Sequence, residues 1–244
     1  MDQQLTVVYE DNHLLVVLKR PNQLTQSDKT GDGDLLSEAR AYIEEKYQKP
    51  GKAYLGLVHR MDRPVSGLIV FARTSKAAAR LSEQVRTHEM YREYVCVAEG
   101  EPAQRFRLTD YLKKDEEANM VRVIPDYLKA EGKLAILNGV TLRQVDGRSL
   151  CAIKLETGRA HQIRVQMAHA GWPLLGDGKY GSERFNKSFE EKGQALYSYK
   201  LVFTFPTDAG ILNYLRGREF TVDKVDFVEK YFDGSVGRSS NADR

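Results

Sequence analysis

One aspartate of this chain is enclosed by arginines. Asp62 lies between Arg60 and Arg63, within the segment from His59 to Gly67. Two arginines could hold the phosphate backbone of a nucleic acid, whereas the carboxylate between them would repel it. A surface that only bound nucleic acid would gain nothing from this aspartate. The arrangement therefore suits a site that carries out chemistry on a nucleotide.

A second group of polar residues follows a threonine and a glycine further along the chain. Gly158 permits a close approach of backbone and ligand, and the amides at the start of a helix beginning near His161 favour an anion. Arg159 adds a planar, permanently charged guanidinium. Arg164 lies about one helical turn beyond His161, so it could meet Asp62 if this face lines the site. The alternative is that Arg159 and Arg164 form only surface salt bridges.

The pattern of apolar and polar residues predicts the elements that must position these two groups. Short apolar runs predict strands, and helical periodicity bounded by capping residues predicts helices. The predicted strands are 6–9, 14–18, 68–72, 94–98, 135–144, 150–156, 199–205 and a short one at 220–222. The predicted helices are 35–47, 75–87, 161–170 and 226–232, and residues 101–132 are expected to form a hairpin or a loop excursion. Strands outnumber helices and seldom alternate with them, which favours an α+β fold.

Composition limits the classes of protein to which the chain can belong. With 244 residues, 41% of them hydrophobic, it can bury one large core or two subdomains that share a site. The net charge of +3 permits binding to nucleic acid without requiring it. Basic residues gather near Asp62, because residues 57–92 contain seven arginines and lysines against three acids.

Cysteine usage and hydropathy argue against several other classes. Cys96 and Cys151 lie far apart in apolar surroundings, which predicts two reduced thiols in the core. The sequence has no Cys/His spacing typical of zinc, so neither a metal nor an organic cofactor is expected. The first residues lack the pattern of a signal peptide, and no apolar run approaches the ~20 residues that span a bilayer. We therefore expect a cytoplasmic protein without a membrane partner.

Four segments together resemble the RluA family of RNA pseudouridine synthases. The resemblance covers most of the chain, from about Val7 to about Phe205, and the segments follow in the order of the family. The family's HRLDRxTSG motif corresponds to His59–Gly67, its KxYxAxxxG motif to Arg92–Gly100, its TGRxHQIRxH motif to Thr157–Gln166 and its GxPxxGD motif to Gly171–Asp177.

This resemblance implies an activity and roles for individual residues. Asp62 matches the catalytic aspartate, Tyr94 the tyrosine that stacks on the target uracil, and Arg164 the arginine that pairs with the aspartate. Arg60 lies where the family places a side chain near the vacated position of the flipped nucleotide. The reaction involves no redox step and needs no cofactor. The residues expected to contact RNA are Arg60, Arg63, Arg159, His161 and Gln162.

The resemblance also implies an architecture and a substrate. The expected fold is a mixed, largely antiparallel β-sheet core with flanking helices and a central catalytic cleft. Residues 1–232 are predicted to form the catalytic domain and residues 233–244 a disordered tail. The chain resembles the compact members of the family, which lack the amino-terminal RNA-binding domain, and is expected to act as a monomer on a stem-loop of tRNA or rRNA.

Departures from the family motifs leave the identity of the RNA open. They are Met61, Val65, Arg92, Cys96, Gln166 and Tyr197. Two alternatives to the isomerase remain, a catalytically silent RNA-binding protein of the same fold and a nucleoside or base hydrolase that uses Asp62 at C1′. The sequence does not decide whether Asp62 acts as a nucleophile or as a base.

Overall fold

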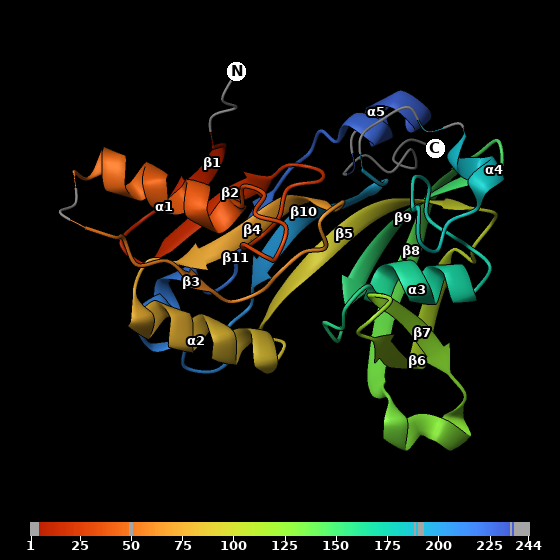
Figure 1. Ribbon diagram of the computed structural model, residues 1–244, viewed down its shortest axis with the longest axis horizontal. Helices are drawn as coiled ribbons and strands as arrows, with labels where there is room; N and C mark the ends of the chain where they lie inside the picture. Colours follow the sequence, from red (N-terminus) through yellow and green to blue (C-terminus); the bar gives the residue numbers. More distant parts are fainter. Residues whose placement is uncertain (1–4, 49–50, 188, 190–192, 235, 237–244) are drawn as a thin grey trace, which may run out of the picture. The chain divides into compact units, whose positions relative to one another are not determined.

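The chain divides into two compact units in a computed structural model, which describes residues 5–48, 51–187, 189, 193–234 and 236 (Figure 1). The first unit comprises residues 1–91 and 200–221, and the second comprises residues 92–199 and 222–244. The boundaries fall within two strands, β5 (Met90–Glu99) and β10 (Leu196–Phe203). The domain limits 1–232 stay a prediction, and most of the predicted disordered tail lies outside the described residues.

The first unit is built on antiparallel strands. β1 (Val7–Glu10) pairs with β2 (Leu14–Lys19), which pairs with β4 (Ser66–Ala72), and the short β3 (Gly56–Leu57) also pairs with β4. Residues 200–203 of β10 pair with β11 (Arg218–Thr221). Two helices, α1 (Leu35–Lys46) and α2 (Ser75–Arg86), flank these strands, and the 3₁₀ helix η2 (Gly210–Leu215) contacts α2 (Figure 1).

The strands of the first unit appear in the sequence as unbroken apolar runs because they lie in its core. Residues 14–17 of β2 and 68–72 of β4 are fully buried on both faces of the sheet. The helices begin where the sequence indicated. Asp34 accepts a hydrogen bond from the Ser37 amide at the start of α1, and Thr74 caps α2 by accepting one from Ala77.

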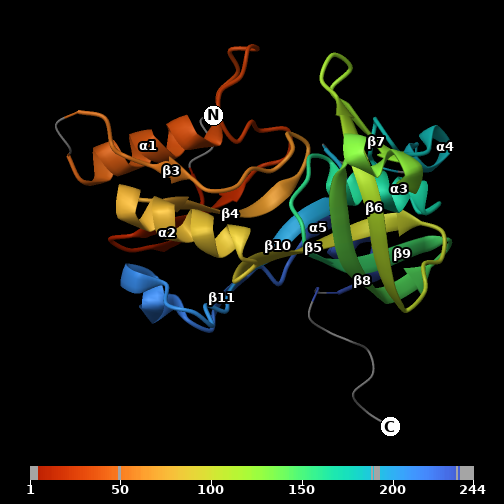
Figure 2. The same ribbon diagram turned by 90° about the horizontal axis from the view of Figure 1, so that it is seen from below.

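The second unit is an antiparallel sheet with the strand order β5-β9-β8-β6-β7. Its strands are β6 (Arg105–Asp115), β7 (Met120–Ile124), β8 (Lys133–Val145) and β9 (Arg148–Leu155), and the 3₁₀ helix η1 (Asp126–Glu131) joins β7 to β8. Helix α3 (Gln162–His169) lies against β6 and β7 in both views (Figures 1 and 2). The short helix α4 (Glu183–Asn186) and α5 (Asp226–Phe232) complete the unit.

Both cysteines lie in the core of the second unit. Cys96 on β5 is directly opposite Cys151 on β9, and both are fully buried free thiols, as predicted. The single tryptophan, Trp172, packs against Phe106 with a distance of 5.2 Å between the ring centroids. Among the described residues, no helix is long and apolar enough to cross a membrane.

The structure confirms the α+β class and corrects several boundaries. The hairpin expected within residues 101–132 consists of β6 and β7. Strand β10 ends at Phe203, two residues before the predicted end, because Phe205 adopts the left-handed φ of 42° that interrupts a strand. The sequence did not predict β3, α4 or the two 3₁₀ helices. These elements are too short to show a periodic pattern of apolar residues.

Candidate active site

The carboxylate of Asp62 is carried by a loop of the first unit between β3 and β4. The Asp62 side chain is half-buried, and its carbonyl accepts a hydrogen bond of 3.1 Å from the Val65 amide, which closes a turn. The preceding Met61 is held from both sides by Thr25, whose hydroxyl donates to the Met61 carbonyl and accepts from the Met61 amide at 3.0 and 3.3 Å. These bonds fix the backbone on each side of the aspartate.

A buried lysine supports the same loop from within the unit. Lys19, at the end of β2, is 1% exposed. Its ammonium donates to the carbonyl oxygens of Arg20, Arg63 and Val65 at 3.0, 2.8 and 2.6 Å. Burial lowers the pKa of Lys19 to about 7, although the negative charge of Asp62 opposes the change. No motif singles out this residue, whose signal in the sequence is a single lysine at the end of the apolar run of β2.

The two arginines beside Asp62 are exposed at the surface of the first unit. Arg63 forms an ion pair of 2.6 Å with Asp32 and donates from Nε to the Asn22 carbonyl at 3.1 Å. His59 is 7% exposed and its Nε2 accepts a hydrogen bond of 3.3 Å from the Val70 amide. His59 therefore packs the loop against β4, while the arginines face solvent.

Tyr94 and Arg164 belong to the second unit. Tyr94 lies on β5 opposite Ile153 of β9 and is 5% exposed. Arg164 lies on α3 and is 3% exposed. Its guanidinium donates two parallel hydrogen bonds to the carboxylate of Asp177, from Nε to Oδ2 at 2.8 Å and from Nη2 to Oδ1 at 2.7 Å. Such a side-on pair fixes the plane of the guanidinium as well as its position.

Asp177 is fully buried, and its carboxylate binds a turn of the backbone in addition to Arg164. Its Oδ1 accepts hydrogen bonds from the amides of Lys179 and Tyr180 at 2.9 and 3.2 Å. Burial by itself would raise the pKa of Asp177, but the bonds and charge of Arg164 and these two amides lower the pKa below its ordinary value. The carboxylate is therefore held in its charged form.

Tyr180 connects Arg164 with the start of α3. The Arg164 guanidinium lies over its ring, 5.2 Å from the centroid. Its hydroxyl accepts a bond of 2.7 Å from the Val121 amide and lies 2.8 Å from His161 Nδ1. His161 precedes α3 with a left-handed φ of 51°. One tyrosine thus contacts both a predicted catalytic residue and a predicted RNA-binding residue.

Gln162 and Arg159 lie at the same turn with different exposure. The Gln162 carbonyl oxygen accepts from the Thr157 hydroxyl and the Arg159 amide at 2.8 and 2.9 Å. Its amide nitrogen donates to the Ile136 carbonyl at 3.0 Å, and the residue is 3% exposed. Gln162 therefore stabilises the turn through its hydrogen bonds, whereas Arg159 lies at the surface. RNA binding by either residue stays a prediction.

The predicted site residues thus form two groups. The first unit carries Arg60, Asp62 and Arg63, and the second carries Tyr94, Arg159, His161, Gln162 and Arg164. The ion pair expected between Asp62 and Arg164 would join the two units and stays a prediction. Within the part of the chain that the structure describes, no three His, Cys, Asp or Glu side chains gather to hold a metal ion.

Comparison with known proteins identifies the family. The family model of RNA pseudouridylate synthase matches residues 13–169, which contain Asp62, Tyr94 and Arg164. "Ribosomal large subunit pseudouridine synthase D" of Zymomonas mobilis is 32% identical over 214 residues, which are 84% of this chain and 66% of that protein. The Bacillus subtilis "Uncharacterized RNA pseudouridine synthase YhcT" is 30% identical over 94% of this chain and 73% of its own length.

The chain therefore belongs to the RNA pseudouridylate synthase family, as the motifs predicted. It spans between about half and two thirds of the length of the first curated relatives that it matches. The solved structure "Human RNA Pseudouridylate Synthase Domain Containing 1" superposes with a TM-score of 0.73 at 21% identity. The superposition covers 95% of this chain and 89% of that one, which confirms the fold.

Proposed function

We propose that this chain is an RNA pseudouridine synthase that isomerises specific uridines of structured RNA. The observation that carries the proposal is that one family model covers the three residues expected to do the chemistry, Asp62, Tyr94 and Arg164. Relatives named for the large ribosomal subunit favour rRNA as the substrate, and tRNA remains the alternative. The monomeric state and the cytoplasmic location remain predictions.

The proposed reaction exchanges one bond to the sugar for another. The bond between C1′ and N1 breaks, a bond between C1′ and C5 forms, C5 loses its proton and N1 gains one. The uridine must first leave its stack to be reached. Asp62 then serves at the sugar as a nucleophile or as a base, Tyr94 stacks on the uracil, and Arg164 keeps Asp62 ionised and oriented.

Mapping of the product distinguishes the proposal from its alternatives. The protein is incubated with total RNA from a strain that lacks the gene, and new pseudouridines are located along the RNA. Pseudouridine at defined positions supports the isomerase. Release of free uracil with an abasic site would establish the hydrolase, and unchanged RNA that the protein nevertheless binds would establish the silent binding protein.

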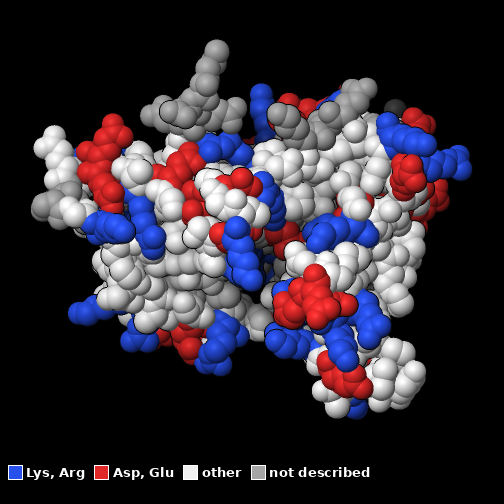
Figure 3. All heavy atoms as spheres, in the orientation of Figure 1, with Lys and Arg blue, Asp and Glu red and all other residues white. Residues whose placement is uncertain are grey.

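RNA binding is expected to depend steeply on salt. Figure 3 shows lysine and arginine side chains interspersed with acidic ones on the face that it draws, so a limited number of basic residues is available to contact phosphates there. Alanine at Arg60, Arg63 or Arg159 should weaken binding, and each replaced arginine that contacts a phosphate should reduce the slope of log K against log salt by about one. Filter binding between low and high salt measures both quantities.

The matched control for this series is Arg86→Ala. Arg86 is an exposed arginine of α2 in the first unit, paired with Glu83 and outside the motifs. Its replacement should leave the affinity and the salt slope unchanged. A binding constant that hardly changes with salt in the wild type would point to a small-molecule substrate instead.

Activity is expected to survive removal of metal ions. The proposed reaction is a redox-neutral rearrangement for which a carboxylate and an arginine suffice. Protein dialysed exhaustively against a chelator should therefore convert uridine at the rate of untreated protein. Loss of activity that one specific metal restores would contradict this mechanism and favour hydrolysis by a metal-activated water.

A further inference from the structure

The arginine expected to orient Asp62 is itself held by a second carboxylate. An arginine side chain loses rotamer freedom when it is fixed in one geometry. In this structure Asp177 fixes it in advance, through the side-on pair to Nε and Nη2. A guanidinium carries five N–H donors, so the pair with Asp177 leaves other N–H groups of Arg164 able to bind a second carboxylate.

The turn that carries Asp177 is rigid. The Asp177 carbonyl accepts from the Gly181 amide and from the Asn186 side chain, both at 2.9 Å. A Cβ atom at Gly181 would lie 2.2 Å from that carbonyl oxygen, so only glycine permits so close a turn. Asp177 is therefore fixed through its backbone and its side chain alike, and it can impose its position on Arg164.

Tyr180 closes the other side of the guanidinium. Its ring lies against Arg164, and its hydroxyl is anchored by the Val121 amide of β7 and by His161. The guanidinium is thus confined by a carboxylate edge and an aromatic face that lie three residues apart in the sequence.

We propose that Asp177 and Tyr180 are positioning residues for the isomerisation, which act by holding the Arg164 guanidinium in the orientation that receives Asp62. The proposal rests on the proposed function of Arg164. It assigns a role to two residues whose contacts with Arg164, Val121 and His161 lie within the second unit.

The decisive variant is Asp177→Asn, measured by single-turnover conversion of RNA and by the Kd for the same RNA. The amide keeps the shape of the side chain but presents an NH₂ group or a weaker acceptor to Arg164. The rate is expected to fall by about 10²-fold while the Kd for RNA stays unchanged. Asp177→Glu, which restores the charge, should recover part of the rate.

Tyr180 is tested by comparing Phe and Leu at this position. Tyr180→Phe retains the ring against Arg164 and should keep most of the rate, whereas Tyr180→Leu removes the ring and should lose more of it. Equal losses in the two variants would exclude the ring from the positioning role.

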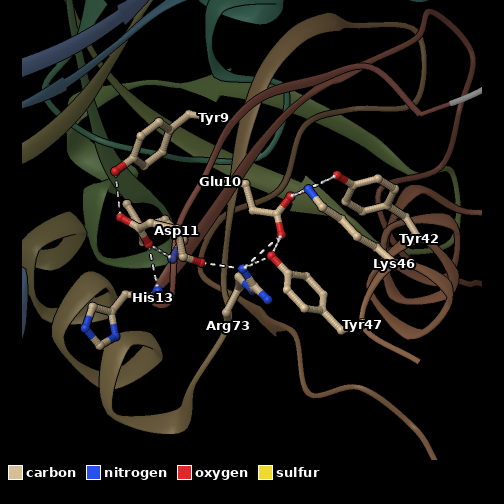
Figure 4. Close-up of polar contacts among 9 residues, drawn as sticks. Tyr9, Glu10, Asp11, His13, Tyr42, Lys46, Tyr47 and Arg73 are labelled. Carbon is tan, nitrogen blue, oxygen red and sulfur yellow. Dashed lines mark hydrogen bonds and ion pairs between the residues drawn. The ribbon is translucent and has the colours of Figure 1, made fainter. Parts of the chain in front are cut away.

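A control with the same chemistry is available in the first unit. Figure 4 shows Glu10, whose side chain is 8% exposed, between Lys46 and Arg73 with bonds of 2.7 and 2.9 Å. Tyr42 and Tyr47 also donate to this carboxylate. Glu10→Gln removes a buried, paired charge outside the site, so it should lower the Tm and leave the rate and the Kd for RNA unchanged.

A spectroscopic readout separates this proposal from the proposed function. In ¹⁵N spectra the Arg164 Nε–H bonded to Asp177 should give a slowly exchanging signal that Arg164→Lys removes and Asp177→Asn shifts. An inactive wild type with this signal would reject the isomerase and leave the positioning contact in place. An active wild type whose Asp177→Asn variant retains the wild-type rate, or whose Kd for RNA rises in proportion to the loss of rate, would overturn the positioning role.

Discussion

Asp62→Asn is expected to reduce pseudouridine formation by at least about 10³-fold while RNA binding remains close to that of the wild type. An asparagine has nearly the same volume, but its amide can serve neither as a nucleophile nor as a base. The loop should keep its shape, because Thr25, Val65 and Lys19 hold it through backbone atoms. Single-turnover conversion and filter binding on the same RNA measure the two effects separately.

Asp32→Asn is the matched control for this experiment. Asp32 is an exposed aspartate of the same unit, with half of its side chain accessible, and it pairs with Arg63 of the loop that carries Asp62. Its replacement should leave the proposed turnover nearly unchanged. Turnover by Asp62→Asn near the wild-type rate would refute the assignment of the catalytic carboxylate.

Lys19→Met is expected to destabilise the protein by about 3 kcal/mol and to slow turnover as well. Methionine fills a similar volume, but it leaves the carbonyl oxygens of Arg20, Arg63 and Val65 without the donor that Lys19 supplies. Two of them, on Arg63 and Val65, flank the segment that carries Asp62. Denaturant unfolding gives the loss of stability, and Lys76→Met, on the exposed face of α2, supplies the control.

The Lys19 contribution should also give stability a characteristic dependence on pH. The folded-state pKa is about 7, below the ordinary value of 10.5, so the unfolded chain binds more protons between these limits. The free energy of unfolding of the wild type should therefore rise with pH in this window, by up to about 1.4 kcal/mol per pH unit. Lys19→Met should lack this rise, and parallel pH curves for the two proteins would contradict the assignment.

Much of the fold follows from the sequence because its signals are local. Buried strands such as β2 and β4 appear as apolar runs, and α2 carries both its cap at Thr74 and its periodic buried face. The motif that contains Asp62 combines opposite charges within four residues, which is recognisable without a structure. The buried environment of His59 likewise agrees with the loop-packing role that an isolated histidine most often has.

The residues that support the site were missed because their roles depend on contacts between distant segments. Lys19 reaches carbonyls more than forty positions away, and a lysine after a strand is ordinarily a surface residue. Asp177 anchors a local turn through the amides of Lys179 and Tyr180, but its pair with Arg164 requires α3 and the 177–180 turn to come into contact. No local periodicity or residue spacing in the sequence predicts that these two segments come into contact.

The placement of Trp172, Cys96 and Cys151 supplies natural reporters for measuring the stability of one unit alone. The chain's only tryptophan and both of its cysteines belong to the second unit. Intrinsic tryptophan fluorescence and the rate of thiol labelling therefore follow opening of that unit without any engineered label. A substitution in the first unit, such as Lys19→Met, that changes these signals would reveal thermodynamic coupling between the two units. Unchanged signals from both reporters would show that the units unfold independently.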